Sequence, residues 1–395
     1  MQAGESSTAS EDSGRYTLWG GPLSIYTAKV RSYLIKKGIP YRELFPSHPD
    51  FGNRIVPALG FFVIPVLETP DGEIVQDSSD IIDYLEERFP EPCFVPTTPL
   101  QRAVVALLCA YGSEGLNQPS MHYRWSFMAE HGDYIRTEFG RAASPSRDRQ
   151  ERIDTAAPMV ELMTAHLPRI GIDAATIPAI EAAYLDLLDV LDDHFLHHPY
   201  LLGGRPSLAD FGFMVGLYAH LARDPVPSVL MKNRAPNVYR WTERMNLANV
   251  DDGEFPRAGD AYLPDDTLPE TLEPLLSLVF RDWGPELTAS MAQYNQWVAA
   301  NPELPAGHLA AASGQRAVHP SVGQISYQLR GVTVQRECWA DMLWHFDRAA
   351  AVARDLDGTA LEHWTALLAR TGGKQTMALV PARPLRREDN AVVLG

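Results

Sequence analysis

Residues 62–85 read FVIPVLETPDGEIVQDSSDIIDYL and contain the clearest fold signals of the chain. The apolar run Phe62–Glu68, the turn signal Pro70-Asp71-Gly72 and the short run Glu73–Gln76 predict a β-hairpin. Apolar residues then recur at helical spacing from Ser79 to Phe89. The stretch therefore predicts two antiparallel strands followed by a helix.

The residues before this hairpin predict a strand, a helix and a second strand that is parallel to the first. Tyr16–Trp19 is typical of a short strand, Thr27–Lys37 has helical spacing, and Gly38 after two lysines is a common way to end a helix. Tyr41–Phe45 predicts a second strand, and a loop with one short helix leads to the hairpin. The order strand, helix, strand, loop, strand, strand, helix indicates a mixed α/β unit.

Pro65 lies inside an apolar strand run, where it cannot donate to the strand ladder. A cis Ile64–Pro65 bond at the start of a strand would explain this and would turn the Ile64 backbone toward a cleft. The alternative is an edge strand with a trans proline.

The segment Gln76–Asp80 joins the last strand to the helix. Ser78 or Ser79 can cap the helix, whose free N–H groups would bind a carboxylate, and Asp77 could hold an ammonium group. Together they suit the head group of an amino acid. Plain capping is the alternative for each residue alone.

Ser24 lies after a Gly-Pro turn and at the start of the first predicted helix. Unpaired N–H groups and the helix dipole favour negative charge there, and a hydroxyl in this place can donate to a thiolate and lower its pKa. The alternative is that Ser24 is a turn or capping residue.

The chain after residue 90 is predicted to be helical. Residues 91–99 form a proline-rich linker and residues 100–268 an all-helical domain, in which Ser207 and Asp210 occupy the positions of a capping box. Residues 269–395 are an extension that we expect to pack on the helical domain. Within the extension we expect a hairpin at Gln324–Val334 and an extended, solvated basic tail around Arg383–Arg387. The predicted helices are Gln101–Gly112, Ile153–Leu167, Ile177–His194, Pro206–Tyr218, Val238–Met245, Leu272–Val279, Pro285–Ala300, Glu337–Arg354 and Thr359–Arg370.

Together these motifs resemble the cytosolic glutathione transferases, especially the serine-type classes. The resemblance covers residues 16–245. Its residues are Ser24, Tyr26, Thr27, Lys29, Val30 and Arg31 at the first helix, Ile64-Pro65-Val66-Leu67, Asp77-Ser78 with Ile81-Ile82-Asp83-Tyr84-Leu85, and Leu202-Gly203-Gly204 with Ser207-Leu208-Ala209-Asp210.

The resemblance implies a thioredoxin-like α/β domain at residues 15–90, followed by the helical domain. It implies that Ser24 activates the thiol of glutathione for attack on a small, hydrophobic electrophile. Ile64 and Pro65 would bind the cysteinyl unit, Asp77 and Ser78 the γ-glutamyl end, and the protein would be a homodimer. Ile25 replaces the proline that usually follows the catalytic serine, so the alternative is a non-catalytic binding or interaction protein with this fold.

The composition of the chain argues against some classes of binding partner. The net charge of −16 argues against nucleic acid and against an anionic membrane surface. Three scattered cysteines without a CxxC pair favour the cytoplasm and disfavour a thioredoxin-like oxidoreductase. Residues 1–14 are typical of a disordered tail, and no apolar run is long enough to cross a bilayer.

Two further motifs are less specific as candidate functional sites. Met121–Trp125 is expected at a turn of the helical domain, where it could face the second substrate; interhelical packing with a surface Arg124 is the alternative. His194–His198 has a spacing near that of metal ligands but is more typical of a helix end, so we expect no metal site.

Overall fold

The computed structural model describes residues 14–248 and 253–395. The predicted tail at residues 1–14 therefore lies almost entirely outside the described residues. The N-terminal unit is a four-stranded sheet in the order β2-β1-β3-β4, as the mixed pattern predicts. Strands β1 and β2 are parallel because helix α1 returns the chain between them, whereas β3 and β4 form the hairpin. The elements are β1 (Tyr16–Trp19), α1 (Ile25–Lys37), β2 (Tyr41–Leu44), η1 (Phe51–Ile55), α2 (Val56–Leu59), β3 (Val66–Glu68), β4 (Ile74–Gln76) and α3 (Ser78–Arg88).

Strand β3 is shorter than the predicted Phe62–Glu68 and begins at Val66, directly after Pro65. It lies between β1 and β4, so it is not an edge strand. The Ile64–Pro65 bond is cis, and of the two interpretations the one with a cis bond at a strand start is confirmed.

The helical domain contains more helices than predicted. Helices α5, α6 and α10 have no counterpart in the sequence analysis. The capping box of Ser207 and Asp210 is present at the start of α9. The elements are α4 (Pro99–Ala110), η2 (Tyr111–Gly115), α5 (Asn117–Trp125), α6 (Met128–Ala143), α7 (Arg149–Ala165), η3 (Leu167–Ile170), α8 (Ile177–His197), α9 (Leu208–Gly216), η4 (Leu217–Ala222), α10 (Pro225–Arg234) and α11 (Pro236–Met245).

The C-terminal extension differs from the expectation in two places. Residues 337–339 end a strand instead of starting a helix, because the predicted hairpin is longer and turns at Arg330-Gly331, both with positive φ. The expected extended tail is a short helix followed by a second hairpin. The elements are α12 (Leu272–Asp282), α13 (Gly284–Ala300), β5 (Ser321–Leu329), β6 (Val332–Trp339), α14 (Ala340–Arg354), α15 (Gly358–Thr371), α16 (Lys374–Met377), β7 (Leu385–Glu388) and β8 (Ala391–Leu394).

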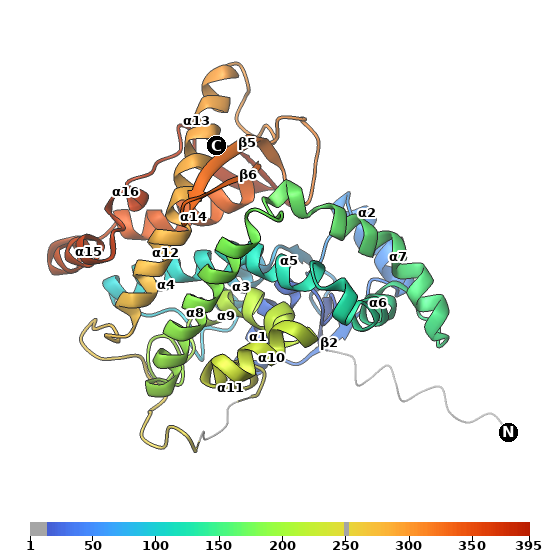
Figure 1. Ribbon diagram of the computed structural model, residues 1–395, viewed down its shortest axis with the longest axis horizontal. Coiled ribbons are helices and arrows are strands. Elements are labelled where there is room, and N and C mark those ends of the chain that lie inside the picture. Colours follow the sequence, from blue (N-terminus) through green and yellow to red (C-terminus); the bar gives the residue numbers. More distant parts are fainter. Residues whose placement is uncertain (1–13, 249–252) are drawn as a thin grey trace.

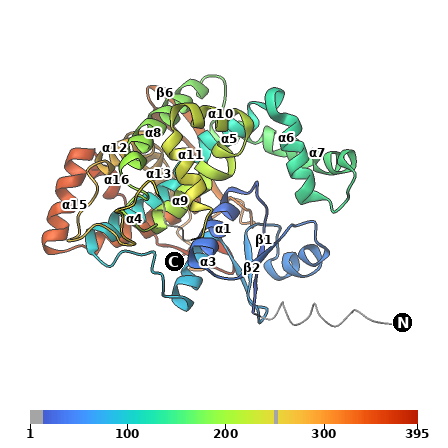
Figure 2. The same ribbon diagram turned by 90° about the horizontal axis from the view of Figure 1, so that it is seen from below.

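The extension lies on one side of the helical domain, with α6 and α7 on the other side (Figures 1 and 2). Helices α14 and α15 pack against α4, α12 packs against α8, and β6 contacts η3. One hydrophobic core contains buried residues of all three parts, such as Val30, Leu107 and Leu343. The exact domain boundaries stay a prediction. No helix of the described residues is both long and apolar enough to cross a membrane.

Candidate functional site

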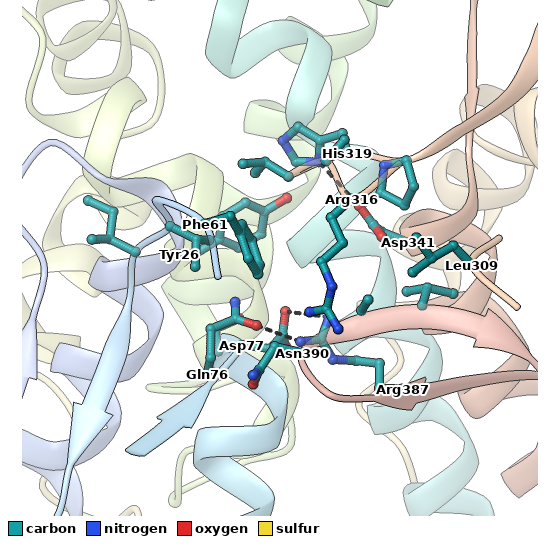
Figure 3. Close-up of a pocket in the computed structure, with 18 of the residues that line it drawn as sticks. Tyr26, Phe61, Gln76, Asp77, Leu309, Arg316, His319, Asp341, Arg387 and Asn390 are labelled. Carbon is teal, nitrogen blue, oxygen red and sulfur yellow. Dashed lines mark hydrogen bonds and ion pairs between the residues drawn. The ribbon is translucent and has the colours of Figure 1, made fainter. Parts of the chain in front are cut away.

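A narrow cleft of about 70 Å³ lies where the N-terminal sheet, the helical domain and the extension meet (Figure 3). The N-terminal unit contributes side chains that precede or begin β3 and α3, and η2 contributes Glu114. The extension contributes charged groups from its loop 309–320, from α14 and from the β7–β8 hairpin. The polar and charged lining residues are Tyr26, Gln76, Asp77, Ser78, Glu114, Gln315, Arg316, His319, Asp341, His345, Arg387 and Asn390.

Four of the five predicted site residues line this cleft, namely Ile64, Pro65, Asp77 and Ser78. Ser24 is not among the lining residues. It is the N-cap of α1, where its Oγ accepts a hydrogen bond from the Thr27 N–H at 3.2 Å. This capping role is the alternative that the sequence left open for Ser24.

Asp77 is the N-cap of α3 and is held in a positive-φ conformation (φ 83°). Its carboxylate accepts a hydrogen bond from the Ser79 N–H at 2.7 Å. Burial alone would raise the pKa of the Asp77 carboxyl, but the charges of Arg387 and Lys29 and the hydrogen bond from the Ser79 N–H outweigh it and lower this pKa. Asp77 is therefore a carboxylate at neutral pH, which suits an ammonium ligand.

Arg387, from strand β7, lies against the acidic residues Asp77 and Asp80 at the start of α3 (Figure 3). Its Nε donates to Asp80 Oδ2 at 2.8 Å, its Nη2 donates to Gln76 Oε1 at 2.6 Å, and its Nη1 lies 3.8 Å from Asp77 Oδ2. Its side chain is only 11% exposed. The predicted solvated basic patch at Arg383–Arg387 is therefore wrong at Arg387, because the hairpin turns this residue onto the N-terminal unit.

A buried group of titratable side chains forms the inner wall of the cleft. Glu114 Oε1 accepts a hydrogen bond from Tyr26 Oη at 3.3 Å and lies 3.4 Å from His345 Nε2. Burial, with Asp341 and Asp77 nearby, raises the pKa of Glu114 well above its ordinary value. Burial also lowers the pKa of His345 to about 3, so this imidazole is neutral at pH 7. Burial therefore favours the neutral, hydrogen-bonding forms of Glu114 and His345 in this wall.

A second acid of this wall is Asp341, on the first turn of α14. Its Oδ2 lies 3.3 Å from His319 Nδ1. Burial raises the pKa of the Asp341 carboxyl. Asp341, His319, Glu114 and His345 were not predicted from the sequence, because each comes from a segment far from the quoted motifs. Arg387 was predicted only as part of a solvated basic tail. Tyr26 was noticed, but only as a matching position of the first-helix motif.

The segment Met121–Trp125 is buried, which favours the interhelical packing that was the alternative. It belongs to helix α5 and is not a turn, and Arg124 is buried instead of lying at the surface. The Arg124 guanidinium pairs with Asp224 at 2.7 Å and donates to the Leu23 carbonyl at 2.8 Å. The residue therefore joins the helical domain to the turn before α1.

His194 also has a packing role. Its Nδ1 lies 2.8 Å from Thr271 Oγ1 and its Nε2 lies 3.3 Å from the Tyr200 carbonyl. Residues 14–248 and 253–395 contain no group of three His, Cys, Asp or Glu side chains suited to hold a metal ion.

Two family models match the chain. The glutathione S-transferase N-terminal domain matches residues 18–93 and the glutathione S-transferase C-terminal domain matches residues 174–244. Residues 18–93 thus carry the N-terminal domain of the glutathione S-transferases, and residues 174–244 carry their C-terminal domain. The site residues Ile64, Pro65, Asp77 and Ser78 lie within the first matched domain, whereas the extension lies beyond the second.

Curated relatives match less than a quarter of the chain. The chain is 33% identical over 94 residues to the stringent starvation protein A homolog of Coxiella burnetii, which is 23% of this chain and 44% of the relative. It is 37% identical over 81 residues to the maleylacetoacetate isomerase of Pseudomonas aeruginosa, which is 19% of this chain and 38% of the relative. The chain thus matches less than half the length of these relatives.

Solved structures of glutathione S-transferases are similar over about two thirds of the chain. The protein from Rhodospirillum rubrum F11 is 18% identical with a TM-score of 0.37, covering 65% of this chain and 96% of that chain. The protein from Methylobacterium radiotolerans, in complex with glutathione sulfonate, is 23% identical with a TM-score of 0.35, covering 65% of this chain and 100% of that chain.

Proposed function

We propose that this protein is a glutathione-dependent transferase that binds glutathione in the cleft and directs its thiol at a small, hydrophobic electrophile. One observation carries the proposal: Ile64, Pro65, Asp77 and Ser78 line a single cleft in the matched N-terminal domain. A backbone group, a carboxylate and a helix N-terminus therefore face the same space, which is the set of groups that a γ-glutamyl peptide requires.

Each part of glutathione has a proposed partner. The Asp77 carboxylate holds the ammonium group of the γ-glutamyl end, and Ser78 with the first N–H groups of α3 holds its carboxylate. The cysteinyl unit pairs with the Ile64 backbone. Among the described residues, no backbone hydrogen bond joins Ile64 to another residue, so its amide and carbonyl can serve a ligand.

The thiol needs a hydrogen-bond donor that stabilises its ionised form. We assign this role to Ser24, whose Oγ accepts a bond from Thr27 and keeps its own O–H to donate. Tyr26, which lines the cleft, is the alternative donor, provided that its O–H turns from Glu114 to the thiol. Burial and Glu114 raise the pKa of the Tyr26 hydroxyl, so it remains protonated and able to donate at neutral pH.

A second candidate is a non-catalytic protein that binds a ligand or partner through this fold. Two observations favour it: Arg387 already occupies the acidic side of the cleft, and the cleft volume of about 70 Å³ is small. Pockets that enclose drug-sized ligands measure roughly 300–1,000 Å³. Under the main proposal, the hairpin that carries Arg387 or the loop 309–320 moves when glutathione enters.

Calorimetry with glutathione tests the proposal. We expect Asp77→Asn and Ser78→Ala each to weaken binding about tenfold or more, because a charge-assisted contact contributes roughly 1.5–3 kcal/mol. Glu87→Gln, on an exposed position of the same helix, is the matched control. Unchanged affinity in both cleft variants would refute the binding mode. Binding without turnover over a panel of electrophiles would favour the second candidate.

We also propose that the protein is a cytoplasmic homodimer, as the family resemblance and the free cysteines imply. Light scattering at several protein concentrations tests the dimer. A molar mass equal to that of one 43.8 kDa chain would refute it.

A further inference from the structure

A second cavity, of about 180 Å³, lies between α3, α4 and α14. It forms because α14 packs against α4 with small residues at the contact, including Ala106 and Ala349. His345 lines both this cavity and the glutathione cleft, but the other lining residues differ. Neither the family resemblance nor the proposed function assigns a ligand to this cavity.

Lys29 contributes a buried cation to the wall of this cavity. The residue is 1% exposed, and its Nζ donates to Ser79 Oγ at 2.9 Å and to Ser113 Oγ at 3.3 Å. Among the described residues, no carboxylate lies within ion-pair distance of it. Asp77 and Glu114 interact with Lys29 electrostatically, but neither carboxyl group forms a hydrogen bond or an ion pair with it. Lysine is almost never fully buried without a charged partner, and an ammonium group has three donors, of which two are used here.

The rest of the cavity is apolar inside and charged at its mouth. The mouth carries Arg102, which is exposed, and the ion pair of Arg348 with Asp83, whose side chains are 42% and 44% exposed. A ligand with a charged head and an apolar body would therefore find both of its parts matched. The apolar wall residues are Ile82, Val105, Ala106, Leu208, Ala349 and Val352.

We propose that this cavity binds a small amphipathic carboxylate. The carboxylate accepts the remaining N–H of Lys29, and the alkyl or aryl body lies against the apolar walls. The volume of about 180 Å³ suits a small acid such as hexanoate or benzoate. The two arginines at the mouth attract anions to the entrance.

Cys109 provides a reporter inside the cavity. Its side chain lines the wall and is partly exposed, so a thiol reagent can reach it. Cys93 is also partly exposed but is not a lining residue, and Cys338 is buried. The labelling rates of Cys109 and Cys93 in one sample therefore separate occupancy of the cavity from a general effect of the ligand.

The experiment measures labelling by N-ethylmaleimide, resolved by peptide mass spectrometry, and calorimetric affinity. The probes are hexanoate and its uncharged counterpart hexan-1-ol, without glutathione. We expect hexanoate to slow labelling of Cys109 but not of Cys93, and to bind about tenfold or more tightly than hexan-1-ol because only the acid makes the charge-assisted contact.

Three variants make the test specific. Lys29→Met should abolish the preference for the acid, whereas Lys374→Met, on the exposed surface of α16, should not change it. If Lys29→Met fails to fold, Ala106→Phe fills the cavity and keeps Lys29, and it should abolish protection of Cys109. Equal affinity for hexanoate and hexan-1-ol, or unprotected Cys109 at saturating hexanoate, would overturn the proposal. Glutathione affinity has no part in either readout, so failure here leaves the proposed function untouched.

Discussion

The guanidinium of Arg387 donates from Nε to the carboxylate of Asp80 at 2.8 Å, joining residues 307 positions apart. The bond ties the last hairpin of the chain to the first turn of α3, which is the proposed site for the γ-glutamyl group. Arg387 places a cation beside Asp77 in the position where the ammonium group of a ligand would lie. The extension therefore takes part in the site and does not only cover it.

Arg387→Ala is expected to raise the affinity for glutathione, because it removes the cation that competes for Asp77. The gain should reach about tenfold, the value of one charge-assisted contact. Calorimetry measures it, with the exposed neighbour Arg386→Ala as the matched control. A fall in affinity would show instead that Arg387 binds the carboxylate of the ligand.

Ser24→Ala and Ser24→Gly separate the two roles of this hydroxyl. Loss of the N-cap should cost about 1 kcal/mol of stability in the alanine variant and only a few tenths in the glycine variant. If Ser24 donates to the thiolate, both variants should raise the pKa of bound glutathione equally, which ultraviolet absorbance of the thiolate against pH measures. An unchanged thiol pKa in both would transfer the role to Tyr26, for which Tyr26→Phe is the next variant.

His194 should make the protein less stable as the pH falls from 7 to 5. Burial and the neighbouring His198 lower the pKa of folded His194 to about 3, whereas the unfolded residue titrates near 6.5. Below pH 6.5 the unfolded state binds the extra proton, so stability falls with pH, by about 2 kcal/mol at pH 5. Denaturant unfolding at both pH values should show a smaller loss for His194→Asn than for the parent or for the exposed His363→Asn. Equal losses in all three would contradict the assignment.

The extension and the helical domain should unfold together, because they share one core. Trp283 of the extension is 2% exposed, and its ring lies 5.7 Å from that of Tyr111 in the helical domain. Trp283→Ala should cost about 3–5 kcal/mol and keep a single calorimetric transition. Leu361→Ala, at an exposed position of α15, should change stability by less than about 0.5 kcal/mol. A separate early transition in the tryptophan variant would show that the extension is an independent domain.

Local sequence signals predicted the N-terminal sheet well because its turns and caps are marked by residues with special backbone preferences. Gly38 ends α1 in the left-handed region, as expected of glycine after a helix. Helix α6 was missed because it contains Gly132 and Gly140, which weaken the helical signal. Gly140 serves packing instead: a Cβ there would meet the backbone of Arg152 at 2.8 Å, so the glycine lets α6 and α7 approach closely.

The site was only half predictable for a related reason. One contiguous stretch contains Ile64, Pro65, Asp77 and Ser78. Its proline inside a strand run and its helix-capping residues predicted a binding site there. Glu114, His345 and Arg387 reach the same space from η2, α14 and β7, and no local pattern distinguishes them from packing or surface residues. Their place depends on how the extension folds back over the first two domains.

His345 lines both cavities, so its imidazole ring belongs to the walls of the two spaces. A ligand that shifts this ring in one cavity changes the wall of the other. Thermodynamic linkage then requires reciprocity: the factor by which a carboxylate alters the affinity for glutathione equals the factor by which glutathione alters the affinity for the carboxylate. The concentration of one small molecule would thus set the occupancy of the other within a single chain.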